Sequence, residues 1–341
     1  MIDTCIYCAI IILFAFLLLY GVKKERIEQE KEVLSRLNAL RGVFAIEVAI
    51  GHVFRYEITL LYPFGKFMII SVAFFFFISA FGMSYSLHTK PDYLNVRTFL
   101  IGKPLYLFLI AVLFFVFNLI VDLICPLDLG FLKRDVLPTF LRQTNWYLFE
   151  LIGFYLLFYL LYRFVPEYRV LIMCGITLAA IIGLYVLGGA AYEAYYASSL
   201  AFPLGLLFGE HYEKVRTFIH GVWGYFVIII LAVFGLACLL WDDGGMISMV
   251  FMRNAICLAG VLIVYLIVCR FRFGNRAMEL ATKYSLEIYL SQFVYQSIAR
   301  GYGWDLKVSF AFTVVMWTLT ALILHPVVVV LGKTLKKSRN S

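Results

Sequence analysis

Apolar stretches alternate with short charged stretches along the whole chain. Eleven apolar stretches can be distinguished, at residues 2–22, 37–54, 67–88, 104–125, 146–165, 168–190, 195–209, 217–241, 248–269, 284–299 and 308–332. Most have the length of about 17–25 residues with which a helix crosses a hydrocarbon core roughly 30 Å thick. None shows the alternation typical of a membrane β-strand. Because a spanning segment must satisfy its own backbone hydrogen bonds, the pattern predicts an all-α, polytopic membrane bundle of about eleven transmembrane helices.

Two segments are expected to depart from a simple spanning helix. The seventh stretch, residues 195–209, is short and contains Pro203 and Gly205, so it is expected to be broken or tilted. The charged stretch Lys23–Arg36 follows the first apolar stretch. It is expected to form a short amphipathic helix at the cytoplasmic surface.

The composition of the 341 residues agrees with a membrane protein. Hydrophobic residues make up 63% of the chain and charged residues 15%, too few charges to cover the surface of a water-soluble protein. The net charge of +8 would otherwise suggest a nucleic-acid partner. Lys and Arg collect in the cytoplasmic loops of membrane proteins, however, so the basic excess is attributed to topology. We therefore expect membrane lipids as partners, and no nucleic acid.

The distribution of Lys and Arg predicts the orientation. Twenty of the 29 lie in the C-terminal tail and in alternate loops beginning after the first apolar stretch, and only eight lie in the opposite loops. The basic-rich set belongs to the cytoplasm. The chain is thus expected to be a multi-pass protein of the plasma (cell) membrane, with its N-terminus outside and its C-terminus in the cytoplasm.

Three regions are expected along the chain. Residues 1–36 form an additional N-terminal span with a cytoplasmic linker, residues 37–332 a ten-helix membrane domain, and residues 333–341 a basic cytoplasmic tail. The first span lacks a basic leading segment and a small-residue cleavage site, so it is expected to remain uncleaved. Cys5 and Cys8 form a C-x-x-C pair without a second Cys/His pair, and His residues show no ligand spacing, so no metal is predicted.

The second apolar stretch contains three ionisable residues, which are costly inside a membrane and therefore mark a candidate site. Arg41, Glu47 and His52 all lie within it, and Arg55 follows at its outer end. Arg41 and His52 are eleven residues apart, which places them on one helix face with a separation of about 16 Å along the axis. Two simpler interpretations remain: Arg41 extends to the inner headgroups, and His52 is an interhelical hydrogen-bonding group.

Four segments resemble those of one family. Arg41 and His52 form an R-x₁₀-H pattern, and three further segments follow in order: Ser71–Gly82 (SVAFFFFISAFG), Trp146–Tyr155 (WYLFELIGFY) and Ser285–Gln292 (SLEIYLSQ). Together they resemble the acyltransferase 3 family of integral-membrane acyltransferases of carbohydrates. The resemblance runs from about residue 36 to the end and matches the ten-helix core of that family. Two departures are evident: Gln292 stands where the family often has His, and Lys103 with Tyr106 replaces a cytoplasmic R-x-x-R pair.

The resemblance implies an O-acyltransferase. It would move an acyl group, typically acetyl, from cytoplasmic acyl-CoA to a hydroxyl of an extracytoplasmic or cell-envelope carbohydrate or glycolipid, with no bound cofactor. The expected catalytic residues are His52 and Arg41, with His52 acting as a general base or an acyl carrier. Arg41, Arg97 and Lys103 are the expected ligands of the phosphates of the donor.

Other residues are weaker candidates for binding the acceptor or supporting the site: Glu150, Trp146, Glu47 and Tyr289. Each also has a structural interpretation. Glu150 suits an ion pair, Trp146 an interfacial anchor, Glu47 a contact with Arg55 or another helix, and Tyr289 with Glu287 helix packing. His325, beside Pro326, is interpreted as a packing residue, and Phe74–Phe77 as a lipid-facing and helix-packing surface.

Two other functions fit a polytopic chain. A transporter or flippase of a polysaccharide or lipid-linked intermediate would explain the intramembrane charges, but the sequence shows no paired broken helices in its two halves. A receptor or scaffold would leave the Arg41–His52 pair unexplained. Dependence on an acyl donor would distinguish the enzyme from the flippase.

Overall fold

The computed structural model describes residues 2–25, 29–54, 62–125, 140, 146–165, 167–240 and 245–340. The α-helices follow one another as α1 (Ile2–Leu19), α2 (Glu30–Ala39), α3 (Arg41–Phe54), α4 (Tyr62–Thr89), α5 (Val96–Leu100), α6 (Tyr106–Ile124), α8 (Trp146–Phe164), α9 (Arg169–Gly188), α10 (Glu193–Tyr196), α11 (Ala201–Glu210), α12 (Tyr212–His220), α13 (Val222–Leu240), α14 (Arg253–Arg270), α15 (Arg276–Lys283), α16 (Ser285–Gly301) and α17 (Leu306–Asn340). Ile101–Leu105 and Ile247–Met252 are π-helical, Gly189–Tyr192 is a 3₁₀ turn, and the strands are β1 (Lys23–Lys24) and β2 (Phe271–Arg272).

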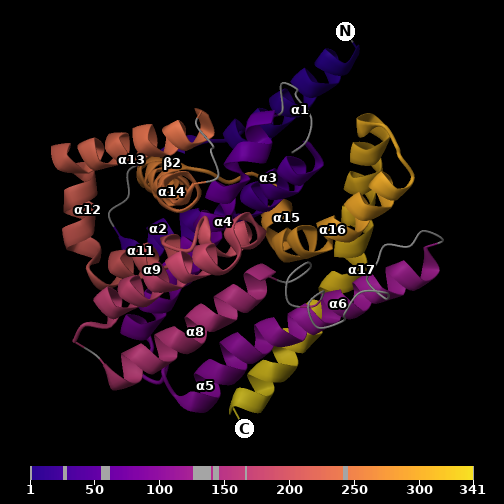
Figure 1. Cartoon of the computed structure of the whole chain (residues 1–341). Helices are drawn as coiled ribbons and strands as arrows, with labels where there is room; N and C mark the ends of the chain where they lie inside the picture. The colour runs from indigo at the N-terminus through magenta and orange to yellow at the C-terminus, as the bar shows by residue number, and fades with distance from the viewer. Residues whose placement is uncertain are drawn as a thin grey trace.

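The fold is an all-α bundle, as the apolar pattern predicts (Figure 1). Within the described residues, six segments are long and apolar enough to cross a membrane: Phe67–Thr89, Val96–Ile124, Trp146–Phe164, Arg169–Gly188, Ile247–Arg270 and Lys307–Lys337. A seventh is obtained if α12 and α13, which meet at an angle of 78°, count as one span. Three further apolar stretches form the shorter helices α3, α11 and α16, of 14, 10 and 17 residues. The total of eleven spans stays a prediction.

The seventh apolar stretch is broken, as expected, but the break precedes Pro203 and Gly205, which both lie inside a helix. Helix α10 ends at Tyr196 and α11 begins at Ala201. Helix α11 packs closely on α4, because a Cβ atom at Gly205 would lie 2.3 Å from the carbonyl oxygen of Phe77. Only a residue without a side chain fits this approach. The phenylalanines Phe74–Phe77 of α4 are buried in the bundle, so the prediction that they face lipid is wrong, and helix packing accounts for them.

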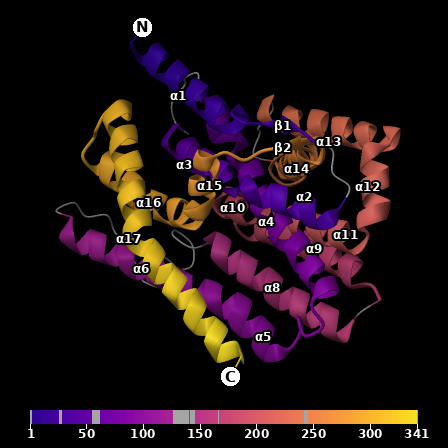
Figure 2. The same ribbon diagram turned by 180° about the vertical axis from the view of Figure 1, so that it is seen from behind.

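Among the described residues of the linker Lys23–Arg36, only Glu30–Arg36 are helical. Lys23 and Lys24 form β1, which pairs antiparallel with β2, so that Lys23 lies opposite Arg272 (Figure 2). Glu25 then contacts Arg36 through an ion pair of 3.3 Å. The prediction of one amphipathic helix is therefore wrong for the first residues of the linker. Pairing with a distant segment satisfies backbone groups that a local helix would otherwise satisfy.

Helix α3 is seated against α15 by a close backbone contact at Gly42. The amide of Gly42 donates to the Thr282 hydroxyl at 3.2 Å, and that hydroxyl donates to the Ala39 carbonyl at 2.8 Å. A Cβ atom at Gly42 would lie 2.3 Å from the carbonyl carbon of Ala281. This contact determines where the N-terminal end of α3 lies.

We expect Gly42→Ala to destabilise the protein by about 1–3 kcal/mol, because the added methyl group overlaps backbone atoms that cannot move aside. The midpoint of denaturation by SDS measures the loss. Gly175→Ala is the matched control, since Gly175 lies in a helix and a Cβ atom there would meet nothing within 4 Å. The control is expected to be neutral or stabilising. Equal midpoints for the two variants would contradict a tight contact at Gly42.

Glu30, in the first turn of α2, is expected to make stability depend on pH. Burial and the nearby Glu213 carboxylate raise its pKa from 4.5 to about 7. Because the folded-state pKa is the higher one, stability is fully present below about pH 4.5 and is lost as pH rises through 7. Glu30→Gln should therefore raise the thermal unfolding temperature at pH 8 and change it little at pH 5. The exposed Glu32→Gln is the control, and a gain of equal size at both pH values for Glu30→Gln would exclude an effect of ionisation.

Candidate active site

A cavity of about 470 Å³ lies among α2, α3, α4, α6, α8, α16 and the π-helical segment Ile101–Leu105. This is within the usual range of small-molecule sites. Its polar lining includes two cations and four tyrosines: Arg41, Lys103, Tyr106, Tyr147, Tyr155 and Tyr289. Three residues from the predicted site, Arg41, Lys103 and Tyr289, thus come together from three different parts of the chain. The cavity offers positive charge and phenol groups to a ligand.

Arg41 differs from the other arginines that lie at least partly inside the bundle. Arg36, Arg169 and Arg253 each have a carboxylate partner, in Glu25, Glu210 and Glu193 respectively. Among the described residues, no carboxylate lies within ion-pair distance of Arg41. A guanidinium that is half-buried without a counter-charge is costly, and an anionic ligand would compensate for it. The cavity is therefore suited to an anion.

Tyrosine side chains surround this guanidinium. The phenols of Tyr106, Tyr147 and Tyr155 all lie within electrostatic reach of Arg41. The ammonium group of Lys103 lies 5.9 Å from the ring centroid of Tyr155, in a cation–π contact. Lys103 belongs to the π-helical segment, which contains Pro104. Such a departure from α-helical geometry is common at functional sites, and it follows here from a proline that lacks a backbone N–H.

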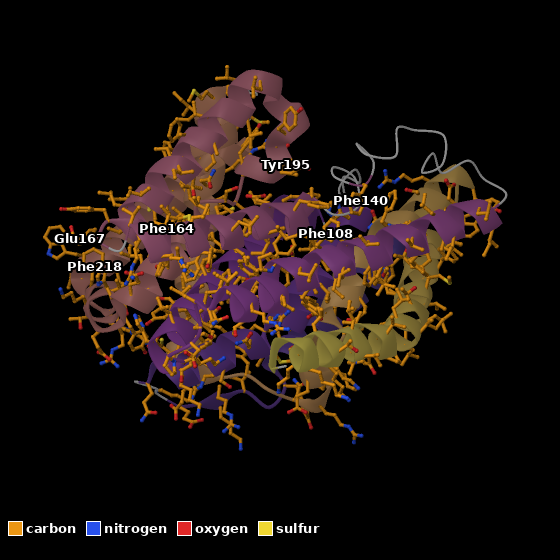
Figure 3. The ribbon with its side chains drawn as sticks, turned by 90° about the horizontal axis from the view of Figure 1, so that it is seen from below. Phe108, Phe140, Phe164, Glu167, Tyr195 and Phe218 are labelled. Carbon is orange, nitrogen blue, oxygen red and sulfur yellow. The ribbon has the colours of Figure 1, made fainter. Side chains whose placement is uncertain are left out.

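Aromatic packing joins α6 and α8, two helices that contribute residues to the cavity lining. Phe140, the described residue between α6 and α8, contacts Phe115 of α6 and Phe149 of α8, with ring centroids 4.9 and 5.0 Å apart. Its ring also lies 6.4 Å from that of Phe108, and Figure 3 shows these two side chains on the same side of the bundle. Edge-to-face pairs of this kind stabilise by about 0.5–1.5 kcal/mol each beyond their buried area.

Three rings meet at the wall of the cavity. Phe75, Tyr147 and Tyr289 come from α4, α8 and α16, and each contacts the other two, with centroids 6.2, 6.0 and 5.3 Å apart. Tyr147 is eight residues from Tyr155 on α8, so the lining extends over about 12 Å along that helix. The three rings form an aromatic cluster in the cavity lining.

His52 lies in the last turn of α3 and is half-buried. It is not among the residues that line the cavity. Because Arg41 is the first residue of the same helix, the two side chains share a face and are separated by about 16 Å along its axis. The expected geometry of the R-x₁₀-H pattern is therefore compatible with α3, and His52 lies beyond the cavity on the helix that Arg41 begins.

Two carboxylates predicted to support the site bind serine hydroxyls. Ser71 of α4 donates to Glu47 at 2.5 Å, so Glu47 contacts another helix, whereas Arg55 lies outside the described residues. Ser199 donates to Glu150 at 2.5 Å. Neither carboxylate lines the cavity or forms an ion pair with a described residue. In the structure both act between helices.

The remaining candidates lie at the edges of the site. Trp146, the first residue of α8, packs edge-on against Tyr195, labelled in Figure 3, with centroids 5.7 Å apart. Arg97 is exposed on α5 and does not line the cavity, so its role in donor binding stays a prediction. A hydrogen bond of 2.8 Å between His325 Nδ1 and Glu287 Oε1 joins α17 to α16. This polar contact replaces the simple packing role expected for His325.

Tyr147 and Tyr155 line the cavity, but they are not among the site residues expected from the sequence, although both lie in the segment Trp146–Tyr155. Tyrosines in apolar stretches are usually interfacial anchors, and nothing in the composition of α8 distinguishes them. Their spacing of eight residues, two turns and about 80° around the helix, was the available signal. It becomes informative only once Arg41 is known to lie opposite them.

Comparison with protein families gives one match, to the acyltransferase 3 family, described as an acyltransferase domain, over residues 34–332. Comparison with curated proteins and with solved structures gives no match. The family match covers nearly the whole chain and includes the four segments from Arg41 to Gln292. The described helices include several that are apolar and long enough to cross a membrane. Because the family match covers most of the chain, the chain belongs to the acyltransferase 3 family and is a membrane acyltransferase.

Proposed function

We propose that this acyltransferase moves an acetyl group from cytoplasmic acetyl-CoA to a hydroxyl of a cell-envelope carbohydrate or glycolipid outside the plasma membrane. The observation that carries the proposal is Arg41, a half-buried cation without a carboxylate partner among the described residues, facing a cavity on the helix that also holds His52. The family supports acyl transfer in general. The cations of the cavity support a polyanionic donor, and the carbohydrate acceptor is what the sequence resemblance implies.

The cavity suits the phosphate end of an acyl-CoA donor. Arg41 and Lys103 supply two positive charges to the cavity lining, and a guanidinium binds phosphate oxygens in a bidentate manner. Arg41 also follows the basic-rich linker that the positive-inside rule assigns to the cytoplasm. A polyanionic donor from that compartment meets the cations first.

His52 supports the transfer step. Histidine has an unperturbed pKa near neutrality, as a base for a hydroxyl requires. In direct transfer, its imidazole takes the hydroxyl proton while the hydroxyl oxygen bonds to the carbonyl carbon of the thioester. The carbon–sulfur bond then breaks, and the imidazolium returns the proton to the thiolate of CoA. The alternative, an acyl-imidazole formed on His52 and then attacked by the acceptor, needs the same placement.

The acceptor is assigned to the opposite side of the membrane from the donor. On α3, His52 lies outward of Arg41 by about 16 Å, in the half of the membrane that the predicted topology places outside. A hydroxyl arriving from that side therefore meets the thioester near His52. A flippase would need no acyl donor, and the family match favours the enzyme.

Removal of the two cavity cations is expected to weaken donor binding. Arg41→Gln with Lys103→Gln should raise the apparent KM for acetyl-CoA by roughly tenfold or more, because binding to the ground state is lost. Titration of acetyl-CoA in membrane vesicles that contain the enzyme and its acceptor measures this change. Lys90→Gln, at an exposed cytoplasmic position, is the control. An unchanged KM in the double variant would show that both cations contribute only to membrane topology and do not bind the donor.

His52→Gln is expected to insert normally but to lose acyl transfer by roughly 10²–10⁴-fold, because an amide cannot take a proton. Mass spectrometry of envelope glycans from cells with equal membrane levels of each variant measures the acetyl content. His325→Gln is the matched control, since glutamine can still donate a hydrogen bond to Glu287, and it should stay active. Near-normal acetylation by His52→Gln would exclude the mechanism and favour the flippase.

A further inference from the structure

Three amide side chains are buried in the bundle with polar atoms that lack partners. Asn118 of α6 and Gln292 of α16 are 0% exposed, and Gln296 of α16 is 4% exposed. Neither amide atom of Asn118 or of Gln292 has a hydrogen-bond partner among the described residues, and the Nε2 atom of Gln296 also lacks one. An unsatisfied buried polar atom typically costs about 1–3 kcal/mol. Several such atoms in one region indicate a site for a polar ligand.

These amides continue the faces that line the cavity. Tyr289 and Gln296 are seven residues apart on α16, which places them within about 20° of each other around the helix, and Gln292 lies about 60° from Tyr289. Leu107, which lines the cavity from α6, is eleven residues from Asn118, again within about 20°. Helices α6 and α16 lie next to one another in both ribbon views (Figures 1 and 2). The amides therefore lie beyond the cavity lining, farther along α6 and α16 on nearly the same helix faces.

The packing of α16 on its neighbours gives the level of the amides along α3. Tyr295 of α16 contacts Phe117 of α6, with ring centroids 6.5 Å apart, so Gln296 and Asn118, each the next residue, lie at the same level. Ala49 of α3 belongs to the same buried cluster as Tyr295. In the predicted topology, α3, α6 and α16 all run from the cytoplasmic side outward. The amides therefore lie between the levels of Arg41 and His52.

We propose that Asn118, Gln292 and Gln296 bind the pantetheine arm of the donor by hydrogen bonds as it reaches from the cavity towards His52. The inference rests on the proposed function, because it takes acyl-CoA as the donor. The arm carries two secondary amides and a hydroxyl, and it needs both donors and acceptors. Each side-chain amide supplies an N–H₂ donor and a carbonyl acceptor. Gln292 thus has a role at the position where the resemblance leads one to expect histidine.

The test compares two probes of different length on the purified full-length protein. Coenzyme A contains the arm, whereas 3′-phosphoadenosine 5′-diphosphate contains only the phosphorylated nucleotide. Gln292→Met and Asn118→Leu keep the side-chain volume and remove the hydrogen-bonding groups. Each should weaken the binding of coenzyme A by about five- to tenfold and leave the nucleotide unaffected. Because the replaced atoms have no hydrogen-bond partner among the described residues, thermal stability without ligand should stay equal or rise.

Ser291→Ala is the matched control. Ser291 is buried on the same helix, but its hydroxyl already donates to the Glu287 carbonyl at 2.8 Å, so its removal should leave both affinities unchanged. Wild-type binding of coenzyme A by both amide variants would overturn the inference and favour contact with the acceptor instead. An equal loss for the nucleotide would also overturn it, since the change would then lie at the cations. Failure of the wild-type protein to bind either probe would overturn the donor assignment itself.

Discussion

The placement of α3 along its own axis governs the geometry of the site. This helix has only 14 residues, about 21 Å of length, which is less than a hydrocarbon core of roughly 30 Å. It is held at its start by Gly42 against α15 and near its middle by Glu47, which accepts a hydrogen bond from Ser71 of α4. Because Arg41 and His52 stand on one helix, a shift of α3 would move both ends of the proposed path from donor to acceptor together.

The site is built from groups that are unfavourable without a ligand. Arg41 lacks a carboxylate partner among the described residues, and the amides of Asn118 and Gln292 lack hydrogen-bond partners there. By contrast, Arg169 is paired with Glu210, and the Asn254 amide donates to backbone carbonyls. These unpaired groups lower the stability of the ligand-free protein, and a ligand that pairs with them would recover this free energy on binding. The aromatic cluster of Phe75, Tyr147 and Tyr289 packs against itself in the lining of the cavity.

The helical class and the shared face of Arg41 and His52 could be predicted from sequence because both depend on local periodicity. Local periodicity does not report contacts between distant segments. The pairing of Lys23 with Arg272, the seat of Gly42 on Thr282 and the meeting of Arg41 with Tyr155 all join residues more than 100 positions apart. Apolar composition likewise does not separate a helix that faces lipid from one that packs inside, which is why Phe74–Phe77 were misplaced. The Glu287–His325 contact could not be predicted because it joins two different helices, and local periodicity does not report such contacts.

The antiparallel pair of β1 and β2 has a consequence for biosynthesis. Lys24 leaves the ribosome long before Phe271, its partner in the pair. At a synthesis rate of about 5–20 residues per second, roughly 12–50 seconds separate the two. During this interval the first helix and its linker have no partner strand, and the backbone of the linker is open to other segments or to chaperones. The final tertiary arrangement of the amino-terminal part is therefore completed only when the last quarter of the chain has been made.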